Sequence, residues 1–203
     1  MMNINETEVI NITLLGRGGM GVVTCAELIA EAAYLSGSFV DVHAYPSFGA
    51  ERRGAPVQAY AKLSRLNKIW DRAQIENPEV LIIFDESVLS QELASSLKKD
   101  GLFIINSERE PVLFVNKYKL SEKTKIIIGD ISKLAIEKGL TIDGNPVINT
   151  PILGLLSKAM PELKLDYLKK VVLKRLGEKI GKLNFELIER GYNLAKILKF
   201  NKT

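Results

Sequence analysis

A glycine-rich turn near the start of the chain constrains the fold more than any other feature. It reads Leu-Leu-Gly-Arg-Gly-Gly-Met-Gly over residues 14–21, between an apolar run, Val9–Leu15, and a helical pattern, Val22–Leu35. A strand, a tight glycine turn and a helix start together make an anion site. The first N–H groups of the helix lack partners there, and glycine leaves room for a phosphate. We therefore expect a phosphate-bearing ligand at this turn, with a turn that only allows close packing as the alternative.

The spacing Gly16-x-Gly18-x-x-Gly21 fits the fingerprint of dinucleotide-binding domains. Asp41 follows the last glycine by about twenty residues, where a ribose-binding carboxylate is expected. It falls inside the predicted strand Phe39–Tyr45, however, and not at its end. No Lys-Ser/Thr pair follows the glycines, which argues against an ATP-hydrolysing loop. A free-standing dinucleotide-binding oxidoreductase of Rossmann type therefore stays open as an alternative function.

Composition limits the chain to a protein with one substantial core. Of its 203 residues 46% are hydrophobic, but no apolar stretch approaches the length of a membrane span. The polar start of the chain, Met1–Glu8, does not look like a secretory signal. The single cysteine, Cys25, excludes an internal disulfide and iron–sulfur ligation by this chain alone, and we expect it to be a buried, inert thiol. These features predict a cytoplasmic protein without a membrane partner.

The net charge of +4 owes much to lysines late in the chain. These lysines alternate with leucines and valines at helical spacing between residues 164 and 182, and acidic residues lie among them. Such a pattern is typical of a solvated helix face. No repeated aromatic platform accompanies it, so we expect no nucleic-acid partner.

Apolar runs and helical patterns alternate along most of the chain. Strands are predicted at Val9–Leu15, Phe39–Tyr45, Val57–Leu63, Val80–Phe84, Leu102–Ile105 and Lys125–Gly129, and helices at Val22–Leu35, Ser90–Lys98 and Ile131–Lys138. Val57–Leu63, with a turn at Leu66-Asn67-Lys68, could form part of an antiparallel edge. The order predicts a three-layer α/β/α fold with a mostly parallel sheet over residues 1–145. A helical C-terminal region of the same single domain is predicted over residues 146–203, with helices at Ile152–Met160, Leu165–Leu176 and Asn184–Phe200, and with Gly177 and Gly181 between the last two.

A long irregular segment, Tyr45–Val57, holds two adjacent arginines, a glutamate, two glycines and two prolines. The planar guanidinium groups of Arg52 and Arg53 suit a carboxylate or a phosphate, and Glu51 could hold one of them in place. Because ligands collect at the carboxyl edge of α/β sheets, we expect this segment and the glycine turn to face a common crevice. An ordinary exposed loop is the alternative, although a loop of this length is usually functional.

Motifs in register along the chain resemble those of a known family. Residues 16–21 and 48–57, then Asn149-Thr150-Pro151-Ile152-Leu153-Gly154, and finally Arg190-Gly191-Tyr192 resemble the gamma subunit of pyruvate/2-oxoacid:ferredoxin oxidoreductases. The resemblance covers nearly the whole chain. Met20 departs from the family, which commonly has Gln at this position. The departure removes a polar side chain but leaves the backbone of the turn unchanged.

The resemblance implies a subunit of an oxidoreductase complex of EC 1.2.7 type. Such complexes oxidatively decarboxylate a 2-oxoacid with coenzyme A, yield acyl-CoA and carbon dioxide, and pass electrons to ferredoxin. Alpha, beta and delta-type subunits supply thiamine diphosphate with its Mg²⁺ and the iron–sulfur clusters. This chain is therefore expected to bind no cofactor and to be inactive alone. An isolated chain with a bare partner-facing surface could form a homodimer.

The glycine turn, the arginine segment and the resemblance together define a candidate site. We expect its residues to line the coenzyme A crevice or the subunit interface: Gly16, Arg17, Gly18, Gly19, Gly21, Phe48, Gly49, Glu51, Arg52, Arg53, Gly54, Asn149 and Thr150. The last two could instead only cap the helix that follows them. No catalytic residue and no metal ligand is predicted.

Other polar and aromatic residues are assigned to structure or left open. His43 is expected to pack or to hydrogen-bond within its strand. Asp85 and Glu86, after the strand Val80–Phe84, fit a functional acid at the sheet edge and a helix cap equally well. Trp70 is expected in surface or interface packing.

Overall fold

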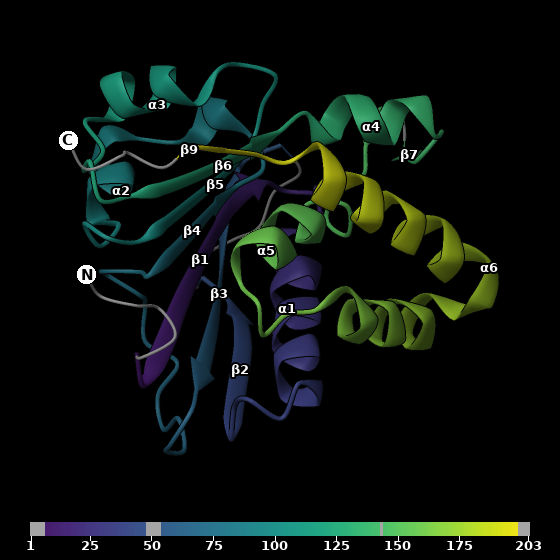
Figure 1. Ribbon diagram of the computed structural model, residues 1–203, viewed down its shortest axis with the longest axis horizontal. Helices are drawn as coiled ribbons and strands as arrows, with labels where there is room; N and C mark the ends of the chain where they lie inside the picture. Colours follow the sequence, from purple (N-terminus) through teal and green to yellow (C-terminus); the bar gives the residue numbers. More distant parts are fainter. Residues whose placement is uncertain (1–6, 48–53, 143, 199–203) are drawn as a thin grey trace.

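The computed structural model describes residues 7–47, 54–142 and 144–198. A seven-stranded sheet runs through this part of the chain in the order β2-β3-β1-β4-β5-β6-β9 (Figure 1). Its strands are β1 (Val9–Arg17), β2 (Asp41–Pro46), β3 (Pro56–Ser64), β4 (Val80–Ile83), β5 (Leu102–Asn106), β6 (Lys125–Gly129) and β9 (Lys196–Leu198). β3 and β9 run against the other five strands. The predicted mostly parallel sheet is confirmed.

Helices cover both faces of the sheet (Figure 1). One face carries α1 (Val22–Leu35), α4 (Ile131–Glu137), α5 (Leu153–Ala159) and α6 (Leu165–Leu194), and the other carries α2 (Gln91–Ser96) and α3 (Pro111–Tyr118). Alternate residues of β4 separate the two cores, since Ile82 packs in the first and Leu81 and Ile83 pack in the second. Burial on both faces explains why the central strands read as continuous apolar runs, and it confirms the three-layer α/β/α fold.

β3 lies inside the sheet, between β1 and β2. Val57 opposes Gly16 of β1, whereas Ser64 opposes both Val9 of β1 and Asp41 of β2. The predicted antiparallel pairing is confirmed, and the outermost strand on this side of the sheet is β2. The chain returns antiparallel after β2, so β2 pairs with β3 and takes the edge itself.

α6 is a single helical run with one break. At Gly177 a φ of 74° and a ψ of 172° interrupt the helix and separate two halves. Gly181 lies buried inside the second half, where an added Cβ would come within 2.9 Å of the Leu173 Cα. The connection predicted between residues 177 and 183 is therefore confined to one residue.

The predicted helix Asn184–Phe200 is wrong at its end. α6 stops at Leu194, and β9 pairs antiparallel with β6, with Ile197 opposite Ile127. An open β6 edge would leave backbone groups unpaired, and the short C-terminal strand satisfies them. α3 and a two-stranded hairpin of β7 (Thr141–Ile142) and β8 (Asn145–Pro146) are further elements that the sequence patterns do not predict.

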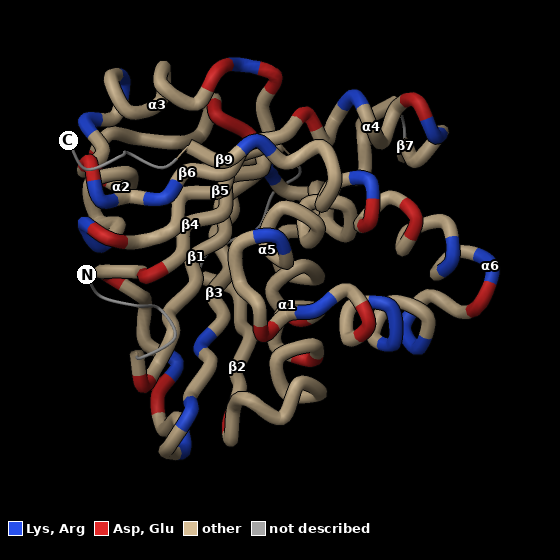
Figure 2. Tube along the Cα trace, viewed as in Figure 1, with Lys and Arg blue, Asp and Glu red and all other residues tan. Residues whose placement is uncertain are grey.

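Lys and Arg residues occur along α6 with Asp and Glu residues among them (Figure 2). Val172 is buried, whereas Lys170 and Lys174 are exposed, as the helical spacing predicts. Every helix within the described ranges falls short of the length or the apolar character that a bilayer span requires.

Candidate functional site

β1 ends at the glycine turn, and α1 begins directly after it. The Met20 N–H donates to the Arg17 carbonyl at 3.0 Å, which closes a four-residue turn. Gly21 then adopts a φ of 74° and a ψ of 30°, a left-handed conformation that costs other residues about 1–2 kcal/mol. No side chain of the described residues caps the first turn of α1. Its first N–H groups are therefore open to an acceptor.

Two of the glycines also allow close packing. A Cβ on Gly16 would lie 2.8 Å from the Val22 Cγ2 and 3.0 Å from the Phe84 Cβ. A Cβ on Gly21 would lie 2.6 Å from the Asn149 Nδ2. Close packing, the alternative to phosphate binding, thus explains these two glycines. The close approach of Gly21 and Asn149 also places this predicted site residue beside the turn.

The segment after β2 returns to the glycine turn through backbone hydrogen bonds. The Gly18 N–H donates to the Ala55 carbonyl at 2.9 Å, and the Gly54 N–H donates to the Gly18 carbonyl at 3.0 Å. Before the segment, the Ser47 N–H donates to the Gln58 carbonyl at 2.9 Å. Gly54 therefore lies beside the turn, as expected. The other predicted residues of this segment lie outside the described residues: Phe48, Gly49, Glu51, Arg52 and Arg53.

Arg17 connects the glycine turn to the end of β4. Its Nε donates to the Asp85 Oδ2 at 2.7 Å, and its two Nη atoms donate to the Gly54 carbonyl at 2.8 Å and to the Ser87 Oγ at 2.7 Å. The side chain stays 38% exposed. The guanidinium is thus held in one orientation and remains accessible to a ligand.

Asp85 combines both roles that its position allows. It pairs with Arg17, and its carboxylate accepts the Ser87 N–H at 2.9 Å as the cap of the 3₁₀ helix η2 (Glu86–Val88). Partial burial acts to raise the pKa of Asp85. The hydrogen bonds from Ser87 and Arg17, with the Arg17 charge, outweigh it and hold this pKa below its ordinary value. The carboxylate is therefore ionised at neutral pH.

A cavity of ≈ 280 Å³ lies beside the turn, near the lower end of the size of ligand pockets, which begins at about 300 Å³. We call it the glycine-turn cavity. The backbone of the glycine turn and the Arg17 side chain form one wall, and the β7–β8 hairpin with the residue after it forms the other. The lining residues are Arg17, Gly18, Gly19, Met20, Gly54, Asp85, Ile142, Asn145, Pro146 and Val147. It opens at the carboxyl ends of β1 and β4, the edge where α/β sheets bind ligands. Such walls suit a molecule with an anionic and an apolar part.

The sequence analysis does not identify Ser87, which bonds to Arg17 without lining the cavity, or the wall formed by the β7–β8 hairpin. Ser87 follows the apolar strand within the run Asp85-Glu86-Ser87. This run of polar residues at a strand end is the signal that could have identified it. The hairpin wall was signalled by the Asp-Gly pair at residues 143–144, which is typical of two-residue hairpin turns.

Thr150 and Asp41 lie apart from the glycine-turn cavity. Thr150 is buried, and its hydroxyl hydrogen-bonds the Asn184 Oδ1 of α6. Asp41 starts β2 at the opposite end of the sheet from the turn, and its carboxylate accepts the Ile69 N–H at 2.7 Å. This position argues against the ribose-binding role that the dinucleotide alternative needs.

The remaining residues of interest have local surroundings. The His43 Nε2 lies 3.7 Å from the Asp41 Oδ2 on the same strand. Trp70 is highly exposed. Cys25 is buried in α1, and burial raises the pKa of its thiol, so no reactive thiolate forms at neutral pH. Within the described part of the chain, no group of three or more His, Cys, Asp or Glu side chains could hold a metal ion.

Fold and site together define a class: a three-layer α/β subunit that presents an accessible arginine and a glycine turn at the carboxyl edge of its sheet. The profile of the family described as pyruvate ferredoxin/flavodoxin oxidoreductase matches residues 11–194, and the chain belongs to this family.

Curated relatives agree over almost their whole length. The pyruvate/ketoisovalerate oxidoreductases common subunit gamma of Pyrococcus furiosus is 34% identical over 93% of this chain and 98% of its own. The pyruvate synthase subunit PorC of Methanocaldococcus jannaschii is 35% identical over 91% of this chain and 96% of its own. The chain is thus a gamma-type subunit of a pyruvate/2-oxoacid ferredoxin oxidoreductase, and its homologues are single subunits of multi-subunit complexes.

Solved structures agree with the fold. The pyruvate oxidoreductase subunit PORC (EC 1.2.7.1) of Thermotoga maritima matches with a TM-score of 0.80 and 27% identity, over 95% of this chain and all of that one. A 2-oxoglutarate:ferredoxin oxidoreductase from Magnetococcus marinus matches with a TM-score of 0.72 and 20% identity, over 93% of this chain and 31% of that chain. The second likeness concerns the fold alone.

Proposed function

We propose that this subunit lines the coenzyme A crevice of a complex that oxidatively decarboxylates a 2-oxoacid to acyl-CoA and carbon dioxide and passes electrons to ferredoxin. One observation carries the proposal. The reciprocal hydrogen bonds of Gly54 and the glycine turn return the arginine-bearing segment to the edge where Arg17 is held. Coenzyme A carries a diphosphate and a further phosphate, and these groups suit helix N–H groups and guanidinium forks.

The redox and thiamine chemistry belongs, in this proposal, to alpha, beta and delta-type partner subunits. The residues described here do not fit an iron–sulfur cluster or a thiamine-bound metal, because Cys25 is buried and unreactive and no ligand cluster is found among them. This chain's own contribution is to bind and orient the acyl acceptor.

A second candidate role keeps the same residues but gives them to a subunit contact. The exposed apolar side chain of Ile142 on the cavity wall favours it, because such side chains are typical of interfaces. The two roles differ in what a substitution would change.

The test is the double substitution Arg52→Ala and Arg53→Ala in the assembled complex. We expect the KM for coenzyme A to rise at least about tenfold, because a hydrogen bond to a charged group contributes about 1.5–3 kcal/mol. Arg72→Ala is the matched control, since Arg72 is exposed on another loop. An unchanged KM with intact assembly would exclude these arginines from coenzyme binding, and failure to assemble would favour the interface role.

A further inference from the structure

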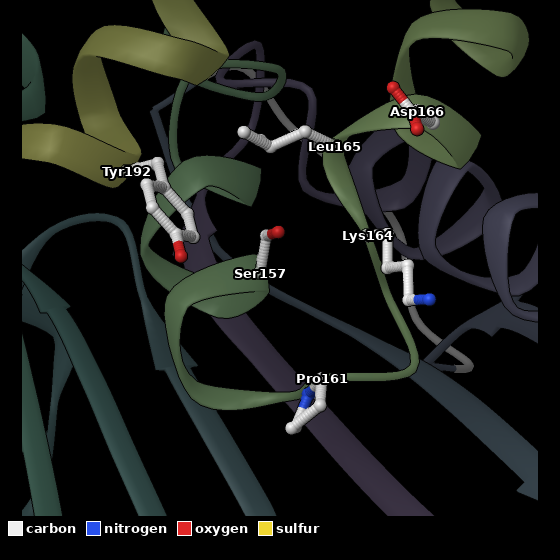
Figure 3. Close-up of a pocket in the computed structure, with 6 residues that line it drawn as sticks. All are labelled: Ser157, Pro161, Lys164, Leu165, Asp166 and Tyr192. Atoms are coloured by element: carbon white, nitrogen blue, oxygen red, sulfur yellow. The ribbon is translucent and has the colours of Figure 1, made fainter.

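A second cavity lies between the end of α5, the start of α6 and the last turns of α6. Its volume is ≈ 260 Å³, and it shares no lining residue with the glycine-turn cavity. We call it the α5–α6 pocket (Figure 3); it is lined by Ser157, Pro161, Lys164, Leu165, Asp166 and Tyr192.

Ser157 is a largely buried residue whose hydroxyl faces this pocket. Its exposed fraction is 8%, and it makes no hydrogen bond with any described residue. A serine inside a helix commonly returns its hydroxyl to the carbonyl four residues earlier. Here the hydroxyl points into the space between Tyr192 and Lys164 (Figure 3). The hydroxyl opens onto the pocket, so it is free to donate to a ligand atom in this space.

The start of α6 offers further donors to the same pocket. The N–H groups of Tyr167 and Leu168 donate to the Lys164 carbonyl, at 3.0 and 3.3 Å. Those of Leu165 and Asp166 have no acceptor among the described residues, and no side chain there caps this helix. Free N–H groups and the helix dipole favour an anion at such a terminus.

Cations flank the pocket on two sides. Lys164 lies across from Ser157 (Figure 3) and forms no ion pair within the described ranges. The Lys158 Nζ lies 4.1 Å from the centre of the Tyr192 ring. Lys164 and Asp166 are the two charged residues of the lining, so their formal charges cancel, and Lys158 beside the Tyr192 ring adds a positive charge next to the pocket.

We propose that the α5–α6 pocket binds a small monocarboxylate. Hydroxyl, N–H and ammonium donors would hold the carboxylate, and Leu165, Pro161 and the Tyr192 ring would contact a short apolar tail. Asp166 repels a second negative charge, which disfavours phosphate and dicarboxylates. The site is independent of coenzyme A binding at the glycine turn.

Calorimetric titration of the full chain with propionate, propionamide and inorganic phosphate tests this site. We expect a dissociation constant for propionate on the order of 1 mM, and at least about tenfold weaker binding of the other two probes. Propionamide binding as tightly as propionate, or no saturable propionate signal, would overturn the proposal.

Variants connect the signal to the pocket. Lys164→Gln should weaken propionate binding about tenfold and Ser157→Ala about fivefold, whereas Asp166→Asn should tighten it about threefold. Lys170→Gln is the matched control, because Lys170 is exposed on the same helix outside the pocket. A gain of affinity cannot come from misfolding, so Asp166→Asn without tightening would count against the assignment.

The carboxylate could belong to a free acid or to an acidic side chain of a partner subunit. The same titration on the assembled complex separates these sources. Retained propionate binding assigns the site to a free acid, and binding lost only on assembly assigns it to a partner's carboxylate. Absence of binding in both preparations rejects the site.

Discussion

The glycine-turn cavity and the α5–α6 pocket differ in how their polar groups are used. Arg17 at the first already donates to Asp85, Ser87 and Gly54. In the second, the Ser157 hydroxyl has no partner among the described residues. A charge that is paired within the chain fixes the shape of a wall, whereas an unpaired donor needs an acceptor from outside. The first cavity is therefore a shaped surface that needs further groups to bind a ligand, whereas the second keeps a free donor for a ligand.

The largest expected effect tests whether packing fixes the shape of the glycine-turn cavity. Gly21→Ala should lower the free energy of unfolding by about 3 kcal/mol, because left-handed strain adds to overpacking against Asn149. Gly37→Ala is the control, since Gly37 has a similar φ of 69° but no neighbour near an added Cβ. It should lose only about 1 kcal/mol. Equal losses in urea denaturation would mean that the Asn149 contact contributes nothing.

A smaller loss is expected from Arg17→Ala. Three hydrogen bonds disappear, but the side chain is 38% exposed, so solvent screening limits the destabilisation to about 1–2 kcal/mol. Arg109→Ala provides the comparison, because Arg109 makes a longer ion pair of 3.5 Å and is 58% exposed. Its loss should stay below about 0.5 kcal/mol. If both variants unfold alike, Arg17 does not fix the wall of the cavity.

The pairing of Asp85 should also appear in the pH dependence of stability. Its folded-state pKa lies below the ordinary value, so its contribution is present above about pH 4 and is lost as the pH falls through the folded-state pKa. Asp85→Asn should be about 1 kcal/mol less stable than the parent at pH 7, with the difference shrinking toward acid pH. A stability difference between the two proteins that stays constant down to acid pH would show that the ionised Asp85 carboxylate does not stabilise the fold.

The smallest effect is expected in the other cavity. Ser157→Ala should change the free energy of unfolding by less than about 0.5 kcal/mol, because the lost hydroxyl has no partner in the described chain. Thr150→Val is the contrast, since the Thr150 hydroxyl bonds to Asn184 in a buried place, and it should lose about 1–2 kcal/mol. A Ser157→Ala loss as large as that of Thr150→Val would reveal an internal partner.

The layers of this fold could be predicted because the central strands are buried on both faces. Runs such as Val80–Phe84 and Lys125–Gly129 have no polar face, which identifies covered strands in any context. β9 is different. Its three residues acquire a strand conformation only by pairing with β6, and Lys-Ile-Leu fits a helix equally well.

The candidate site was predicted where local sequence determines backbone geometry. The glycine turn and its helix follow from neighbouring residues, and Gly54 lies beside the turn as expected. The partners of Arg17 depend instead on which strands become neighbours, since Asp85 follows β4 and β4 pairs with β1. The role of Thr150 likewise depends on the position of α6. Such tertiary contacts cannot be derived from a single sequence.

Ser47 and Gly54 hold the chain on both sides of residues 48–53, through bonds to Gln58 and Gly18. Loop-closure entropy is lost mainly when two distant points are first brought together, and folding has already done this here. A ligand that engages Arg52 or Arg53 would therefore meet a segment whose two ends are already fixed. Affinity at this edge should depend mainly on the contacts that these side chains make with the ligand.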